Sequence, residues 1–335
     1  MNKAFQITSV LVVLIVFSSS MYKSPVFDQG TRISKLLIDL GESATDHHVT
    51  EIDTVKVKLG MELVTKGSTT SPDGSISLKI SEFFVCTDCH NTVKEVGLAS
   101  DNSAENRLAY AMEVGIPYLP GSTFWGMMNR TSWFNDDHIK KYGDLVKDAN
   151  EDLKKSIQLC SKECSSGRHL EEWEMDAMLH YLASLEITVA DLGLGKKETL
   201  MIQNKEEGAG DMLRAKYLQK YPAKFLDAIP VDQRGMGTKG DAGRGKFIYE
   251  RSCMHCHKKG GVTKTVFGNE KKEKDAGWLV DYFEKSNGGS IYWICRNGTA
   301  PKKKTRMYMP IYTEEKLPDS QIEDLAAYLV QQSKL

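Results

Sequence analysis

The stretch Cys86–His90 reads Cys-Thr-Asp-Cys-His, and the stretch Cys253–His257 reads Cys-Met-His-Cys-His. Both are C-x-x-C-H, the pattern to which a c-type haem is attached. Each of two thiols on one turn forms a thioether with a vinyl group of the porphyrin, and the adjacent histidine ligates the iron. A zinc ribbon pairs its C-x-x-C motifs at short separation, and a thiol redox pair has no use for the following histidine. The sequence therefore predicts two covalently bound haem c groups.

These two motifs define most of the expected site. The predicted attachment residues are Cys86, Cys89, Cys253 and Cys256, and the predicted iron ligands from the motifs are His90 and His257. The ligand on the opposite side of each iron sets its potential and reactivity.

For the second haem the candidate is Met309, in the run Arg306-Met-Tyr-Met-Pro310, with Met307 as the alternative. A thioether on a proline-stiffened loop suits a high-potential electron-transfer haem. The alternative is that the methionine only packs in the core. Together with Gly243–His257 and Gln321–Leu329, this run resembles class I cytochrome c. That family has its methionine ligand in a Met-Pro loop before the last helix, and the resemblance implies the same fold and the same role for Met309.

For the first haem the candidate lies in the run Ile157-Gln-Leu-Cys160, which precedes Glu174-Met-Asp-Ala-Met178. These segments resemble those of dihaem thiosulfate dehydrogenases and of the haem subunit of the periplasmic sulfur-oxidising complex. In those families a cysteine beyond the first haem motif ligates the iron. The resemblance implies that Cys160 is a ligand of the first iron, and a catalytic residue if the chain shares their activity.

The chain departs from those families around this cysteine. Ser156 stands in place of an arginine, Gln158 in place of an asparagine, and Glu163-Cys164-Ser165 in place of Arg-Ser-Met. The additional thiol leaves two alternatives open, because Cys160 and Cys164 either form a disulfide, as is ordinary in an exported protein, or leave one thiolate for the iron. If the disulfide forms, a thioether is the remaining candidate ligand, from Met127, Met128, Met175 or Met178. The seventh cysteine, Cys295, is expected to be a buried free thiol.

Hydrophobic periodicity predicts an all-α fold of two cytochrome c-like domains with much irregular loop structure. The expected helices are 145–160, 171–185, 212–221, 243–252 and 321–332, and Leu98–Tyr142 is expected to be an irregular wrap. A short strand pair, with one strand at Val55–Lys58, is expected in the polar lead-in. The expected parts are a signal peptide or anchor at 1–20, a first haem domain at 35–187, a linker at 188–239 and a second cytochrome domain at 240–335.

The N-terminus predicts export. Residues 4–22 carry no charge, Val10–Phe17 is wholly apolar, and Ser18-Ser19-Ser20 offers small residues for cleavage of a secretory signal. Left uncleaved, residues 4–22 would anchor the chain in the inner membrane. In either case the rest of the chain is expected in the periplasm or outside the cell, the oxidising side on which c-type haem is attached.

Charge bears on partners. The net charge is −1, which argues against nucleic acid as a partner. Residues 240–335 nevertheless carry 17 lysine and arginine residues against 12 aspartate and glutamate residues. This lysine-rich part is either a solvated face or a docking patch for an acidic redox protein, which opposite charge would steer. Membrane contact is expected only if the N-terminal segment stays uncleaved.

Two functions remain open from the sequence. The first is an exported dihaem cytochrome that carries electrons between redox partners, with no need of a substrate pocket. The second is an oxidoreductase of the thiosulfate dehydrogenase type, in which Lys162 and Arg168 would hold a sulfur oxyanion at the first haem. A dihaem peroxidase would need an open haem with a nearby acid–base pair, and the sequence reveals no such pair.

Overall fold

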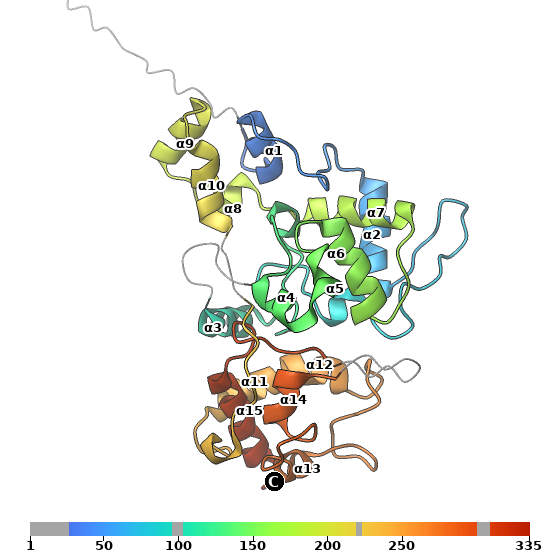
Figure 1. Ribbon diagram of the computed structural model, residues 1–335, viewed down its shortest axis with the longest axis vertical. Coiled ribbons are helices and arrows are strands. Elements are labelled where there is room, and N and C mark those ends of the chain that lie inside the picture. The colour runs from blue at the N-terminus through green and yellow to red at the C-terminus, as the bar shows by residue number, and fades with distance from the viewer. Residues whose placement is uncertain (1–26, 96–102, 219–222, 300–308) are drawn as a thin grey trace, which may run out of the picture.

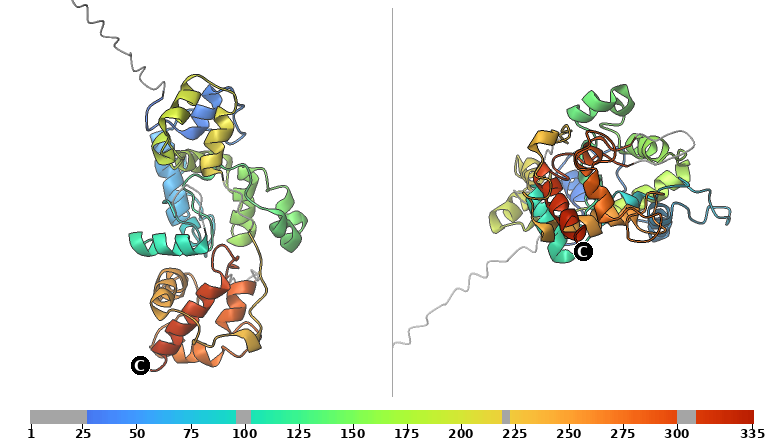
Figure 2. Two further views of the ribbon diagram at one scale, coloured as in Figure 1. Left: turned by 90° about the vertical axis from the view of Figure 1, so that its left-hand side faces the viewer. Right: turned by 90° about the horizontal axis from the view of Figure 1, so that it is seen from below.

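The computed structural model describes residues 27–95, 103–218, 223–299 and 309–335. Over these residues the chain forms helices joined by long loops, with isolated bridges and no β-sheet, so the all-α prediction is confirmed. Figure 1 shows three helical groups stacked along the longest axis, each containing its own buried apolar core. The side view in Figure 2 shows the same stacking. No helix in these four ranges is both long enough and apolar enough to cross a bilayer.

The C-terminal group is built on two crossing helices, α11 (Ala242–Ile248) and α15 (Asp319–Gln332). Gly245 lies at the crossing, where a Cβ would overlap the carbonyl oxygen of Asp324 and would lie 2.9 Å from Cβ of Tyr328. A residue without a side chain is needed there because the two helix backbones approach so closely. Three further helices belong to the group: α12 (Met254–His257), α13 (Ala276–Asp281) and α14 (Ile291–Asn297).

The middle group repeats this crossing with α2 (Thr54–Lys66) and α7 (Glu172–Ser184). A Cβ on Gly60 would overlap the carbonyl oxygen of Ala177 and would lie 2.8 Å from Cβ of Tyr181. In both groups the glycine therefore meets a carbonyl oxygen and the tyrosine four residues further on. The two parts of the chain share the same local helix packing.

The prediction of a strand at Val55–Lys58 is wrong, because these residues lie in α2. The Asp53 side chain accepts hydrogen bonds from the backbone nitrogens of Val55 and Lys56 at 2.8 and 3.3 Å and so starts the helix. Leu63 and Val64 are then fully buried against α7. Helix capping and this burial outweigh the β-propensity of the valines. In place of the expected strand pair, the polar segment before the first motif contains an isolated antiparallel bridge between Thr70 and Ile76.

The expected helix at 145–160 is divided. It consists of α5 (Asp144–Lys147), α6 (Leu153–Leu159) and a π-helical turn, η3 (Cys160–Cys164). The break falls where the Asp152 side chain accepts a hydrogen bond from the Lys155 nitrogen at 3.0 Å and starts α6 anew. The expected helices at 171–185 and 321–332 are present as α7 and α15.

Part of the expected linker at 188–239 is a folded unit with a core of its own. Its helices are α8 (Val189–Leu192), α9 (Lys196–Gln203) and α10 (Ala209–Tyr217), which pack with α1 (Ile33–Asp39). Ile33 and Leu213 are fully buried in this core. The division of the chain at residues 187 and 239 stays a prediction.

The segment expected to be an irregular wrap contains three further elements, α3 (Ala104–Val114), η2 (Met127–Asn129) and α4 (Asp136–Tyr142). Although α3 precedes the middle group's closing helix in sequence, it lies at the junction with the C-terminal group (Figure 1). Its Leu108 and Ala111, and the nearby Tyr118, are buried in the same core as Ile248 and Ile322. The segment 104–118 therefore packs into the core of the C-terminal group.

Candidate haem-attachment sites

The first C-x-x-C-H motif begins on a 3-10 turn, η1 (Cys86–Asp88), and Cys89 and His90 follow this turn directly. The Asp88 carboxylate accepts a hydrogen bond from the Val85 nitrogen at 2.7 Å and starts the turn. The Cys86 carbonyl oxygen then accepts from the nitrogens of Cys89 and His90 at 3.2 and 3.0 Å. This turn brings both thiols and the histidine together, as attachment of one porphyrin requires.

The second motif lies on a continuous helical path. It begins at the end of a π-helical turn, η5 (Tyr249–Cys253), which continues α11, and it ends with α12. The sequence predicted a helix at 243–252 leading into this motif, and α11 with η5 covers that stretch. The thiols of all four motif cysteines are free and partly buried.

His90 is held by the loop that follows the first motif. Its Nδ1 lies 2.6 Å from the Ser122 carbonyl oxygen, and because a carbonyl only accepts, Nδ1 carries the proton and donates. The ring stacks on Phe124, with 4.7 Å between centroids and an interplanar angle of 13°. A proton on Nδ1 leaves the lone pair of Nε2 available to a metal.

His257 repeats this arrangement with different residues. Its Nδ1 donates to the Thr265 carbonyl oxygen at 2.6 Å, and its ring stacks on Phe267 with centroids 4.1 Å apart and an angle of 4°. In both loops the stacked phenylalanine comes two residues after the residue whose carbonyl accepts. Burial lowers the pKa of both histidines, which keeps the rings neutral as iron ligation requires.

The environment of the four thiols is apolar. Burial raises the pKa of Cys86 to about 12 and that of Cys256 to about 11, and it also raises the pKa of Cys89 and Cys253. A reactive or metal-binding thiolate needs the opposite shift. Protonated thiols beside a neutral, oriented histidine fit a covalently attached haem c better than a redox dithiol.

Met309 lies in the C-terminal core. Its nitrogen donates to Thr299 Oγ1 at 2.6 Å, and its carbonyl oxygen accepts from the Thr299 nitrogen at 2.9 Å. The side chain is partly buried against the same apolar cluster as Cys253 and Phe267. This placement is compatible with iron ligation, which stays a prediction for Met309. The alternative, Met307, lies outside the described residues.

Cys160 and Cys164 begin and end the π-helical turn η3, and both thiols are free. The disulfide alternative is therefore not the arrangement in this structure. The pKa of Cys164 is raised well above its usual value. The largest cause is a hydrogen bond with Cys160, and the next is burial. Cys164 is also among the groups that contribute to the raised pKa of Cys89, after burial, Cys256 and Asp88. The sequence favoured Cys160 as a ligand of the first iron, and this role stays a prediction.

The other side chains expected near the first haem have structural partners. Arg168 forms two hydrogen bonds with the Glu174 carboxylate, each 2.6 Å long, so its charge is already matched, whereas Lys162 is exposed. The four candidate thioethers are all buried in the middle core, against which Cys86 also packs: Met127, Met128, Met175 and Met178. Cys295 is a buried free thiol, as predicted.

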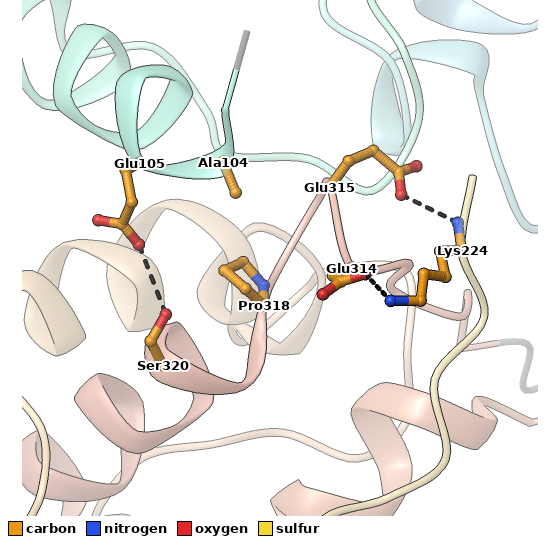
Figure 3. A pocket seen from close by; sticks show the side chains of 7 residues that line it. All are labelled: Ala104, Glu105, Lys224, Glu314, Glu315, Pro318 and Ser320. Carbon is orange, nitrogen blue, oxygen red and sulfur yellow. Dashed lines mark hydrogen bonds and ion pairs between the residues drawn. The ribbon is translucent and has the colours of Figure 1, made fainter. Parts of the chain in front are cut away.

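A separate pocket lies between α3 and the loop before α15 (Figure 3). None of its lining residues is a cysteine or a histidine. Its carboxylates have partners, since Glu314 pairs with Lys224 at 2.8 Å and Glu105 pairs with Arg244 at 2.5 Å. The pocket therefore marks the junction of the two helical groups, apart from the chemistry of the motifs.

Replacement of Gly121 with alanine is expected to disturb the first site. Its Cβ would lie 2.6 Å from both the Cys89 carbonyl oxygen and His90 Nδ1, so the ring would have to move. We expect a loss of about 2 kcal/mol in the free energy of unfolding and a changed ferric spectrum of one centre, measured by denaturant titration and by EPR. Replacement of Ser122 with alanine keeps the accepting carbonyl and serves as the control. Equal behaviour of the two variants would contradict this geometry.

The crossing helices α11 and α15, the helical C-x-x-C-H motif and the oriented His257 are features of a c-type cytochrome domain in the C-terminal part. Residues 240–329 match the family model for cytochrome c oxidase, cbb3-type, subunit III. This match covers about a quarter of the chain, and it supports covalently bound haem c, electron transfer and redox protein partners for this domain. The comparison with curated proteins yields no match, and neither does the comparison with solved structures.

Sequence reasoning missed the groups that orient the two histidines. Ser122 and Thr265 act through backbone carbonyls, and the stacked rings are Phe124 and Phe267. The signal was present as a Ser/Thr-x-Phe run after each motif. It was hidden because the accepting residue follows its histidine by 32 residues in the first site and by 8 in the second.

Proposed function

We propose that the chain is an exported dihaem c-type cytochrome that carries electrons between redox proteins. Its haems are attached at Cys86 and Cys89 and at Cys253 and Cys256. The observation that carries the proposal is the repeated arrangement around His90 and His257. Each donates from Nδ1 to a carbonyl oxygen at 2.6 Å and stacks on a phenylalanine two residues further along. The repeated crossing at Gly60 and Gly245 supports two equivalent units.

In this proposal the residues of the chain hold and orient the cofactors. When bound, haem c supplies an iron that alternates between the ferric and ferrous states. The cysteine pairs fix its position, and the carbonyls of Ser122 and Thr265 fix the tautomer of the ligating histidines. The stacked rings of Phe124 and Phe267 hold the imidazole planes and exclude water, so little rearrangement accompanies a change of charge.

The experiment that tests this function is a spectroscopic redox titration combined with electron exchange. Two one-electron transitions and rapid exchange with an external one-electron protein are expected. Replacement of Cys86 and Cys89 with serine should remove one transition, and replacement of Cys253 and Cys256 should remove the other. A single transition that survives the loss of Cys86 and Cys89 unchanged would contradict a dihaem carrier.

Met309 is proposed as the second ligand of the haem attached at Cys253 and Cys256. Replacement of Met309 with alanine is expected to lower the potential of one centre and to abolish the weak red-end ferric band of thioether ligation, because a thioether favours the ferrous state. Optical redox titration measures both effects. Met307→Ala is the matched control and should change neither. If Met309→Ala keeps the band and the potential, Met309 is not the ligand and Met307 takes its place.

The proposed partners are redox proteins with an acidic docking surface. Exposed lysines flank the second motif, among them Lys258 directly after His257, and Lys271 and Lys272 further along. Lys259, which is also exposed, pairs with Glu270 at 2.7 Å. Export is proposed from the N-terminal sequence, which lies outside the described residues. The electron exchange rate should fall steeply with ionic strength if opposite charge steers the encounter.

An oxidoreductase that acts on a sulfur oxyanion at the first haem is the second candidate. The free thiols of Cys160 and Cys164 favour it, because no disulfide withdraws them from the first haem. The pairing of Arg168 with Glu174 disfavours it, since a carboxylate already matches the charge of that cation. We therefore expect negligible turnover with thiosulfate and a one-electron acceptor. Rapid turnover that Cys160→Ala or Cys164→Ala abolishes would overturn the carrier assignment and make the first haem the active site.

A further inference from the structure

The two haem-attachment motifs touch each other. His255, inside the second motif, places its Nε2 3.1 Å from the carbonyl oxygen of Thr87, inside the first. Since the carbonyl only accepts, Nε2 carries a proton and donates it. The next residue of each motif is also in contact: the Cys256 sulfur lies 4.0 Å from the Asp88 carbonyl oxygen. These residues are 168 positions apart in the sequence, so only the tertiary fold brings them together.

The loop segment 118–122 forms hydrogen bonds next to both motifs. The Tyr118 nitrogen donates to the Arg251 carbonyl oxygen at 3.0 Å, two residues before the second motif. Three residues further on, the Gly121 nitrogen donates to the Cys89 carbonyl oxygen at 2.9 Å. The next residue supplies the carbonyl that orients His90. The segment 118–122 therefore contacts both attachment sites within five residues.

The junction around these contacts is tied by further pairs. Lys316 and Arg107 approach Glu95 at 3.6 and 3.5 Å, and the Tyr118 hydroxyl donates to Gln321 Oε1 at 2.8 Å. Tyr118 is almost fully buried. These hydrogen bonds and ion pairs join the two parts of the chain directly. The relative position of the two motifs is therefore set by the fold and not by a flexible linker.

We propose that His255 is a positioning residue that locks the two attachment motifs edge to edge, so that electrons pass within the chain between the groups they hold. The proposal rests on the dihaem function proposed above. Attachment cysteines lie over the vinyl edge of a porphyrin, because the thioethers form there. Motifs that touch would therefore hold the two groups with their vinyl edges towards each other. Each partner protein then needs to contact only one end of the molecule.

The test uses the full-length holoprotein and its EPR spectrum with both irons ferric. Magnetic interaction between neighbouring centres should make this spectrum differ from the sum of two single-haem spectra, recorded on Cys86→Ser/Cys89→Ser and on Cys253→Ser/Cys256→Ser. His255→Phe keeps an aromatic ring but cannot donate, and it should weaken the interaction. His255→Gln can donate to the Thr87 carbonyl and should restore it. Met254→Leu, at the other variable position of the same motif, is the matched control and should leave it unchanged.

A kinetic readout accompanies the spectrum. After rapid one-electron reduction, exchange between the two centres should slow in His255→Phe and recover in His255→Gln, because the two motifs are free to move apart without this hydrogen bond. If His255→Phe fails to mature, His255→Ala takes its place with the same expected result. Intact mass separates the two proposals, because a wild-type chain with one haem defeats the dihaem function itself. Two haems with a purely additive spectrum, or a His255→Phe variant identical to wild type, would overturn the positioning role alone.

Discussion

Replacement of Glu95 with glutamine is expected to lower the free energy of unfolding by about 3–5 kcal/mol, the usual loss when a buried ion pair is broken from one side. Glu95 is 6% exposed, and it faces Arg107 from α3 and Lys316 from the C-terminal group. Asn91 Nδ2 donates to Glu95 Oε1 at 2.8 Å. Glutamine keeps the shape and an acceptor for Asn91 but leaves two buried cations without their carboxylate.

The control for this change is Glu105→Gln. Glu105 also pairs across the junction, with Arg244, but its side chain is 48% exposed. An exposed pair of this kind contributes about 0–1 kcal/mol. Denaturant unfolding followed by haem absorbance measures both variants. Similar losses for Glu95→Gln and Glu105→Gln would contradict a buried charge cluster at the junction.

The buried carboxyl of Glu95 also makes the free energy of unfolding depend on pH. Burial alone would raise the pKa of this carboxyl, but the charges of Arg107 and Lys316 and the amide of Asn91 outweigh burial and lower the pKa to about 2. A carboxyl with a lowered pKa stabilises the folded state above its ordinary pKa of 4.5, and this contribution is lost as the pH falls from there towards 2. The wild type should therefore lose more stability than Glu95→Gln over this range.

Replacement of Gly245 with alanine is expected to destabilise the C-terminal domain by about 3 kcal/mol, because the added Cβ overlaps the backbone of α15 and forces the helices apart. The same change at Gly60 should destabilise the middle group by a similar amount. Gly243→Ala is the matched control in the same helix. Gly243 is exposed, and its Cβ would meet only the Asp241 carboxylate, at 3.2 Å. This control should be neutral or more stable by up to about 1 kcal/mol. Equal stability of Gly245→Ala and Gly243→Ala would contradict the close helix crossing.

Much of the C-terminal fold could be predicted because its signals are local. The C-x-x-C-H motif, the periodic apolar residues of 321–332 and the Met-Pro loop each lie within a few turns of chain. In the middle group, α7 was predicted for the same reason. Its partner α2 was missed because Val55 and Val57 favour strands, while the residues that make it a helix, Asp53 as a cap and Gly60 as a contact, have no clear signal in the sequence alone.

The features that join the two sites could not be read from the sequence. The His255–Thr87 contact spans 168 residues, and the Tyr118–Gln321 bond spans 203. Both depend on the packing of the middle group against the C-terminal group, which no local pattern predicts. Of the helices in 188–217 only the one at 212–221 was expected, and the core that they form was missed because the helices are short and their apolar partner, α1, lies far away in the chain.

The intact mass of the mature holoprotein under denaturing conditions tests the central claim most directly. Two covalent haems should add the mass of two porphyrins with their irons to the polypeptide, and replacing either motif's two cysteines with serine should remove one of them. A wild-type protein that carries one haem, at Cys253 and Cys256 alone, would contradict the account of two equivalent sites.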